Sequence, residues 1–340
     1  MKTTIRQIAF ILAMLLALTA CGGKPPVEKP AESGEPVKAS LRAALVSPQK
    51  LGDNGVVDFT YASLQKGEKE LGYEIKLIEC ESGEYEESIR AMARDGYDLI
   101  FGLFTSMQDA ISRVAPEYPD THFVLMFGDL DMENVTSINT KVEENSFLNG
   151  VVAANISSTK KVAILAGAEV ADNLRAVAGF EAGVKAADPT VDVTHMYVGS
   201  FEDPTKGKEL ANVLFNEGYD VIMQWCAASS MGIREAVMEQ GEGHYMLGSS
   251  LADLGSVPGQ VYATTDTNYD AVIYDSMKKL LDGTLEGGLL WLGLADKSGG
   301  VVFADDYDEL IQTPQELRDT VSAFEQKIVS GEIIVPTNPS

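Results

Sequence analysis

The chain has 340 residues, a formal net charge of −25 and a hydrophobic fraction of 45%. This acidic balance argues against binding to nucleic acids and to anionic membrane surfaces, because a negative surface repels phosphate groups. The hydrophobic fraction is that of a folded protein with a core, and the length suffices for two domains.

The first 20 residues have the layout of a secretory signal peptide. Lys2 and Arg6 precede the apolar run IAFILAMLLALTA, which is shorter than the roughly 20 residues of a membrane span. The run stops at Cys21, and the tetrapeptide LTAC resembles a bacterial lipobox, in which the cysteine is lipidated. The alternative is an ordinary cleaved signal that happens to contain a cysteine. We expect residues 1–20 to be a lipoprotein signal peptide and Cys21 to anchor the protein on the extracytoplasmic face of the cell membrane.

Residues 22–40 contain four prolines and three glycines but almost no large apolar side chain. Such a composition cannot build a packed core and is typical of a flexible spacer. We therefore expect a tether over residues 21–40.

From Leu41 onward, short apolar runs alternate with amphipathic stretches. In the first series we expect strands at 41–47, 74–79, 97–104, 122–127 and 135–142, and helices at 59–72, 84–96 and 106–118. In the second series we expect strands at 161–167, 192–199, 220–225 and 244–250, and helices at 172–187, 204–218 and 230–240. This β-α-β alternation implies parallel sheets with helices on both faces.

The remaining segment is too long for a simple C-terminal extension. It contains a strand at 261–267, a helix at 269–283, short strands at 289–294 and 299–303, and a helix from Thr313. We infer that the chain crosses between two lobes more than once. Our assignment is 41–140 plus 263–288 for lobe I and 141–262 plus 289–336 for lobe II. Two doubly wound α/β lobes joined by such a hinge would form a closing cleft beyond the carboxyl ends of their strands.

The sequence contains none of the common catalytic motifs: no G-x-S-x-G, no H-E-x-x-H, no P-loop and no dinucleotide-binding glycine motif after a strand. The three histidines lack metal-ligand spacing, and we expect structural roles for them. Cys80 and Cys226 are single cysteines, for which two buried free thiols are favoured over a disulfide. We expect a protein without enzymatic activity, metal or cofactor; the weaker alternative is a nucleoside-cleaving enzyme.

Loops at the predicted strand ends carry aromatic and acidic side chains. A flat solute ring stacks on aromatic rings, and carboxylates accept hydrogen bonds from its hydroxyl groups. The candidate ligand-binding residues are Asp53, Asn54, Phe59, Phe104, Thr105, Phe127, Asp129, Phe201, Trp225, Ser250 and Thr267.

The chain resembles the Bmp/PnrA family of basic membrane lipoproteins, the solute receptors of ABC nucleoside importers. The resemblance covers about Leu41 to Pro336 and is densest in KVEENSFLNGVVAA, VAGFEAGVKAADPTVDV, YVGSFEDPTKGKELANVLFNEGYDVIMQ and YDAVIYDSMKKLLDG. It implies a type I periplasmic-binding-protein fold, an ABC permease as partner and a purine-nucleoside ligand. In the family the base lies between aromatic rings and acidic groups hold the ribose.

The sequence departs from the family pattern at several ligand positions. Val56 and Val57 replace a Phe-Asn pair after the first strand. Ser250 stands where members carry a ribose-binding aspartate, and a lysine expected near Thr267 is missing. Because serine lacks the charge-assisted hydrogen bonding of a carboxylate, we expect weaker binding of inosine or guanosine than is typical of the family. A free purine base, another heteroaromatic compound or a different small solute are alternative ligands.

These observations together predict a monomeric, lipid-tethered receptor that binds a nucleoside or a related small solute and delivers it to an ABC permease. The alternative is a ligand sensor or surface-interaction lipoprotein of the same fold without transport.

Overall fold

The computed structural model describes residues 40–52 and 56–339. The predicted signal peptide, residues 21–39 of the tether with Cys21, and the candidate ligand-binding residues Asp53 and Asn54 therefore lie outside the described residues. Within those two ranges, no helix combines the length and the apolar character that a membrane span requires.

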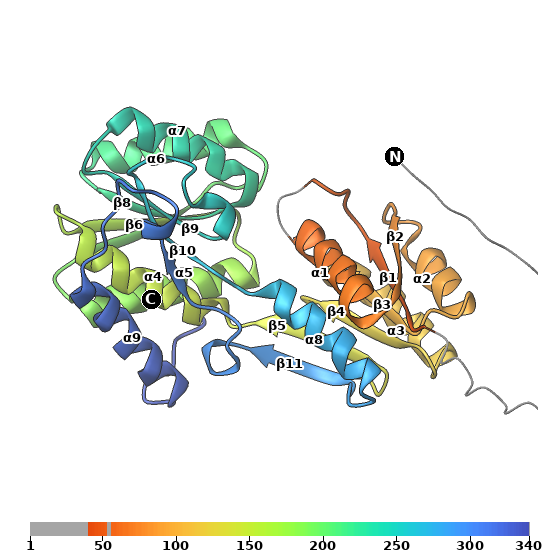
Figure 1. The fold of residues 1–340 in the computed structure, drawn as a ribbon. Coiled ribbons are helices and arrows are strands. Elements are labelled where there is room, and N and C mark those ends of the chain that lie inside the picture. Colours follow the sequence, from red (N-terminus) through yellow and green to blue (C-terminus); the bar gives the residue numbers. More distant parts are fainter. Residues whose placement is uncertain (1–39, 53–55, 340) are drawn as a thin grey trace, which may run out of the picture. The chain divides into compact units, whose positions relative to one another are not determined.

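The first sheet consists of six parallel strands in the order β2-β1-β3-β4-β5-β11 (Figure 1). The strands are β1 (Arg42–Ser47), β2 (Glu74–Glu79), β3 (Leu99–Leu103), β4 (His122–Met126), β5 (Val135–Thr140) and β11 (Gly288–Leu292). Helices α1 (Val56–Leu71) and α8 (Tyr269–Leu281) contribute to the core on one face, and α2 (Tyr85–Arg94) and α3 (Gln108–Val114) to that on the other. Because both faces are covered, the central strands β3 and β4 are buried along their whole length.

The second sheet repeats this arrangement in the order β7-β6-β8-β9-β10-β12. Its strands are β6 (Lys161–Ala166), β7 (Asp192–Tyr197), β8 (Val221–Trp225), β9 (Tyr245–Gly248), β10 (Val261–Thr265) and β12 (Val301–Phe303). Helices α4 (Val142–Ile156), α5 (Ala171–Ala187) and α9 (Gln315–Val329) cover one face, and α6 (Pro204–Asn216) and α7 (Ser230–Gln240) the other. The edge strand β12 runs antiparallel to β10, whereas the sequence analysis expected parallel sheets throughout.

Helix α4 is an element that the sequence analysis missed between residues 142 and 161. Nearly all of its side chains are buried, including those of Asn145, Ser146 and Asn149. A helix buried all round has no apolar stripe, so the 3.6-residue periodicity that reveals amphipathic helices is missing from its sequence. The helix also approaches α5 closely: a Cβ atom on Gly150 or Gly183 would overlap backbone atoms of the other helix.

The chain passes between the two sheets three times: at Lys141, at residues 266–268 and at Gly293. The strand pairing places residues 263–265 in the second sheet and 289–292 in the first, which is the reverse of our assignment for these residues. The reason is that β10 remains paired in the second sheet up to the crossing at 266–268, and β11 remains paired in the first sheet up to the crossing at Gly293. Hydrogen bonds join the crossing segments, among them Lys141 N–H to the Leu292 carbonyl at 2.8 Å and Asp266 N–H to the Gly300 carbonyl at 3.0 Å.

Candidate ligand-binding site

The strand order locates one ligand-binding region in each lobe. In parallel sheets of this order, ligands bind beyond the carboxyl ends of the strands where the chain reverses its winding direction. These points lie between β1 and β3 in the first sheet and between β6 and β8 in the second. Residues with positive φ occur near the same ends, namely Phe104, Phe127, Ala227 and Asn268. Backbone strain in residues other than glycine is concentrated at functional sites in folded proteins.

Three aromatic rings gather at this end of the first lobe. Phe104 and Phe127 stack with their centroids 5.9 Å apart, and Tyr269 approaches Phe127 edge-on at 5.4 Å. Side chains normally alternate between the two faces of a strand, but Leu103 and Phe104 both pack on the α1–α8 face, as do Met126 and Phe127. The positive φ of each phenylalanine, 68° and 61°, breaks the alternation. A third ring between Phe104 and Phe127 would need about 7 Å, twice an ordinary carbon–carbon contact, so a ligand ring cannot lie between these two.

In the second lobe, Phe201 and Trp225 lie on opposite faces of the sheet. Trp225 ends β8 and packs with Met223 on the α4–α5 face. Phe201 covers Gly167, the residue after β6, which by strand alternation belongs to the α6–α7 face together with Leu165. Phe201 as a residue remains 39% exposed, whereas Trp225 is half-buried. These two rings therefore do not stack on each other.

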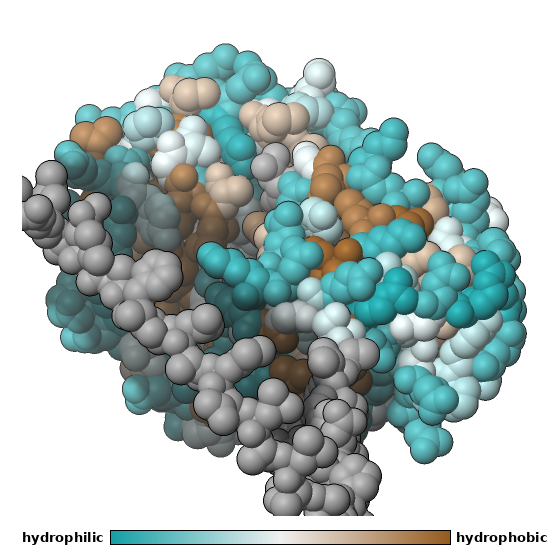
Figure 2. Space-filling model, turned by 45° about the vertical axis from the view of Figure 1, so that its right-hand side comes forward, coloured by the Kyte–Doolittle hydropathy of each residue, from teal (hydrophilic) through white to brown (hydrophobic). Residues whose placement is uncertain are grey.

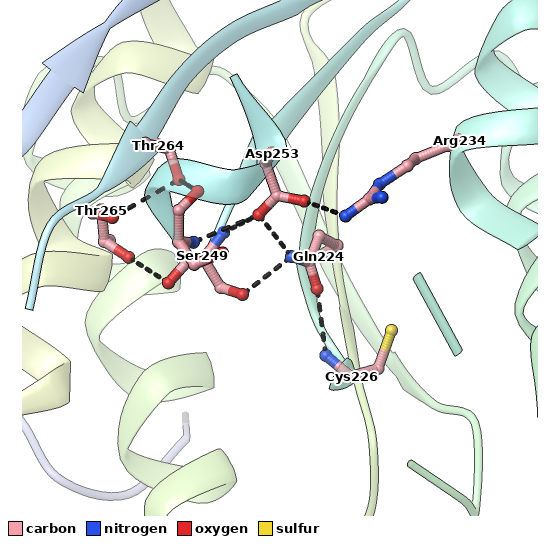
Figure 3. A network of polar contacts seen from close by, with 8 residues as sticks. Gln224, Cys226, Arg234, Ser249, Asp253, Thr264 and Thr265 are labelled. Carbon is pink, nitrogen blue, oxygen red and sulfur yellow. Dashed lines mark hydrogen bonds and ion pairs between the residues drawn. The ribbon is translucent and has the colours of Figure 1, made fainter. Parts of the chain in front are cut away.

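Ser250 lies in a loop that is held by the buried carboxylate of Asp253. Figure 3 shows this carboxylate with its partners Arg234 and Gln224. Asp253 is fully buried and accepts hydrogen bonds from Arg234 at 2.6 Å, from Gln224 at 2.8 Å and from the backbone N–H groups of Ser249 and Ser250 at 2.9 and 3.1 Å. The Ser250 hydroxyl in turn accepts a bond from the Asp253 N–H. The aspartate nearest to Ser250 along the chain is thus occupied by protein partners.

Thr267 lies in a crossing segment, where it contacts a residue that the sequence analysis did not select. Its side chain hydrogen-bonds to Tyr269, and the Thr140 hydroxyl lies 3.5 Å from the Tyr269 hydroxyl. Burial raises the pKa of Tyr269, and the charge of Asp172 at the start of α5 adds to this effect. Tyr269 therefore connects the rings of the first lobe to the crossing segments that begin after Thr140 and contain Thr267. Its position just after a predicted strand was a signal that could have identified it.

The other candidates lie near the carboxyl ends of the first sheet. Phe59 is half-buried in α1, and Thr105 is exposed directly after Phe104. Asp129 is exposed, and its backbone N–H donates to Gln108 Oε1 at 3.0 Å. The face of the molecule in Figure 2 is largely hydrophilic, with apolar patches between the hydrophilic residues.

The arrangement suits recognition of a solute rather than nucleophilic chemistry. Cys226 is a free, buried thiol at the end of β8, and burial raises its pKa to about 12, which suppresses the reactive thiolate. Cys80 is also a free thiol, so the structure pairs neither cysteine. In the described part of the chain, no group of three or more His, Cys, Asp and Glu side chains is placed to hold a metal ion.

Two similar α/β lobes, joined by three crossings and carrying aromatic residues beyond the carboxyl ends of their strands, define the type I periplasmic-binding-protein fold, as predicted. Solved structures share this fold. A solute-binding protein of an ABC transporter system from Aeropyrum pernix K1 has a TM-score of 0.73 and 22% identity, over 87% of this chain and 94% of that chain. One from Conexibacter woesei has a TM-score of 0.74 and 22% identity, over 88% and 99%.

Residues 40–339 match the family described as ABC transporter substrate-binding protein PnrA-like, and the chain belongs to this Bmp family. The ABC transporter nucleoside-binding protein BmpA of Lactococcus lactis is 28% identical over 99% of both chains. Basic membrane protein A2 of Borrelia garinii is 26% identical over 98% of this chain and 96% of its own. The family resemblance expected from the sequence is therefore confirmed, and with it the role of a substrate-binding protein of an ABC transporter.

Proposed function

We propose that the protein is a membrane-anchored receptor that closes its two lobes around a flat heteroaromatic solute, a nucleoside or a related compound, and passes it to an ABC permease. The observation that carries this proposal is the presence of aromatic rings beyond the carboxyl ends of strands in both lobes. Phe104 and Phe127 follow β3 and β4 in the first lobe, where Tyr269 at the start of α8 joins them, and Phe201 follows β7 in the second lobe. Contacts from both lobes to one ligand would favour the closed population.

Each lobe would contribute one side of the ring stack. Phe104 and Phe127 are already in mutual contact, so a ligand ring would lie on their outer side and meet a second-lobe ring on its other face. The exposed ring of Phe201 supports this role. Binding in this manner needs no metal and no catalytic group.

A relative supports a nucleoside-like ligand, and Ser250 argues against tight binding of a ribose. The Lactococcus lactis relative is named as a nucleoside-binding protein. In this chain Ser250 stands where the family pattern has an aspartate, and Asp253 is engaged by Arg234 and Gln224. A ribose would therefore lack a charge-assisted acceptor at this position. We propose that a free base or another heteroaromatic solute binds more tightly than a ribonucleoside.

The anchor would be a lipid on Cys21. The segment after it is rich in proline and glycine, which would let a tethered receptor reach both the solution and its permease. We propose that the mature protein acts as a monomer on the extracytoplasmic face of the membrane. Palmitate labelling of the full-length chain and of Cys21→Ser in a bacterial host would test the anchor, since only the original chain should incorporate the label.

Calorimetry with inosine, guanosine, adenine and guanine tests the proposed function. We expect binding of at least one of these compounds, and nucleoside dissociation constants above the micromolar range because the Ser250 position lacks a carboxylate. Phe201→Ala should weaken the tightest interaction about tenfold, because it removes the second-lobe ring that is proposed to stack on the ligand. Unchanged affinity in this variant would contradict the stacking arrangement, and sub-micromolar inosine binding would contradict the ligand preference.

A further inference from the structure

We propose that Gly167 is a positioning residue for ligand binding, because its missing side chain provides the surface on which the Phe201 ring lies. The inference rests on the proposed function and deepens it: the stacking surface of the second lobe is built from a glycine and a phenylalanine together. It assigns a role to the first residue after β6, which no candidate motif had included.

Space, and not backbone conformation, is what requires glycine here. A Cβ atom at position 167 would overlap two atoms of the Phe201 ring, Cε1 and Cδ1, and would make a tight contact of 3.0 Å with a third, Cζ. Gly167 does not have the positive φ that Gly199 has, so alanine would be compatible with its backbone conformation. Any larger residue at position 167 would therefore displace the Phe201 ring without changing the backbone conformation at the end of β6.

The backbone of Phe201 is fixed, so only the ring can respond. The Ser229 N–H donates to the Phe201 carbonyl at 3.1 Å. The buried Ser229 hydroxyl donates to the Ser200 carbonyl at 3.1 Å and accepts from the Asp203 N–H at 2.9 Å. These bonds hold the loop on both sides of Phe201. A ring lifted from Gly167 would have to rotate outward into the space where the ligand is proposed to lie.

Gly167 also stands at the point of the second sheet where the winding direction reverses. Its N–H donates to the Trp225 carbonyl at 3.0 Å, and its carbonyl accepts from the Gly199 N–H at 2.7 Å. The residue therefore connects the strand end that carries Trp225 with the loop that carries Phe201. Ligands of such sheets bind at this point, so a displaced ring would alter binding directly.

The first test is calorimetry of Gly167→Ala with inosine and with adenine. We expect an affinity loss of about tenfold, similar to that of Phe201→Leu. The double variant should lose no more than either single one, because both changes remove the same surface. Gly83→Ala is the matched control, since a Cβ at Gly83 meets open space, and it should bind as the original chain does. Original affinity in Gly167→Ala, or additive losses in the double variant, would overturn the proposal.

A second test does not depend on a ligand. In protein labelled with 4-fluorophenylalanine, the ¹⁹F resonance of Phe201, assigned by its loss in Phe201→Leu, should shift in Gly167→Ala and stay in place in Gly83→Ala.

Thermal unfolding gives a third test. If Gly167→Ala melts at a lower temperature than the original chain, adding Phe201→Ala should restore much of the lost melting temperature, because it removes the overlap. An unshifted resonance, or a loss of melting temperature that Phe201→Ala leaves unchanged, would contradict the packing of the Phe201 ring on Gly167. If the original chain binds neither inosine nor adenine while the resonance shifts, the proposed ligand class is wrong and the packing of the ring on Gly167 is supported.

Discussion

Replacing Asp253 with alanine is expected to lower the free energy of unfolding by about 3–5 kcal/mol, the usual effect of removing one partner of a buried ion pair. The change would leave Arg234 without its carboxylate. It would also remove one of the two acceptors of the Gln224 amide and the acceptor of the Ser249 and Ser250 N–H groups (Figure 3). Urea unfolding of the mature chain, followed by circular dichroism, measures the change.

Asp203→Ala is the matched control for this prediction. Asp203 is exposed and caps α6 by accepting a hydrogen bond from the Lys206 N–H at 2.9 Å, so its loss should cost about 1 kcal/mol. If the two variants were equally stable, the carboxylate of Asp253 would not organise the loop as described.

Gly183→Ala is expected to destabilise the second lobe by about 3 kcal/mol, at the upper end of the usual cost of overpacking. A Cβ there would overlap the carbonyl oxygen of Phe147 in α4. A backbone atom cannot rotate away as a side chain can, so the two helices must separate along their whole contact. Thermal unfolding of this variant and of Gly83→Ala measures the effect, and equal melting temperatures would contradict the close packing of α4 and α5.

Most of the fold could be predicted from local sequence patterns, and the features that differ from the prediction depend on contacts between distant parts of the chain. The helix predicted at 204–218 begins where α6 begins, because Asp203 caps it and Pro204 suits its first position, and both signals depend on residues adjacent in sequence. Helix α4 was missed because it is buried on all sides, and the antiparallel β12 depends on which edge strand the returning chain meets. Neither feature leaves a periodic signal in the sequence.

Prediction of the site from the sequence fails for the same reason, because its geometry depends on contacts between distant residues. The sequence places Phe104 and Phe127 at strand ends, but their direct stacking results from two positive φ values that no motif announces. Likewise, Ser250 and Asp253 are three residues apart, and the sequence does not reveal that the carboxylate points to Arg234. Tyr269 was overlooked because a tyrosine at a helix start is ordinary until its contacts with Phe127 and Thr140 are known.

Closure of the two lobes on a flat solute is the central claim, and small-angle X-ray scattering of the mature chain tests it most directly. Scattering would be recorded without ligand and with saturating amounts of the tightest-binding compound from the calorimetric panel. We expect the radius of gyration to fall on binding, and to fall less in Phe201→Ala at the same ligand concentration. A radius unchanged by a compound that calorimetry shows to be bound would contradict closure.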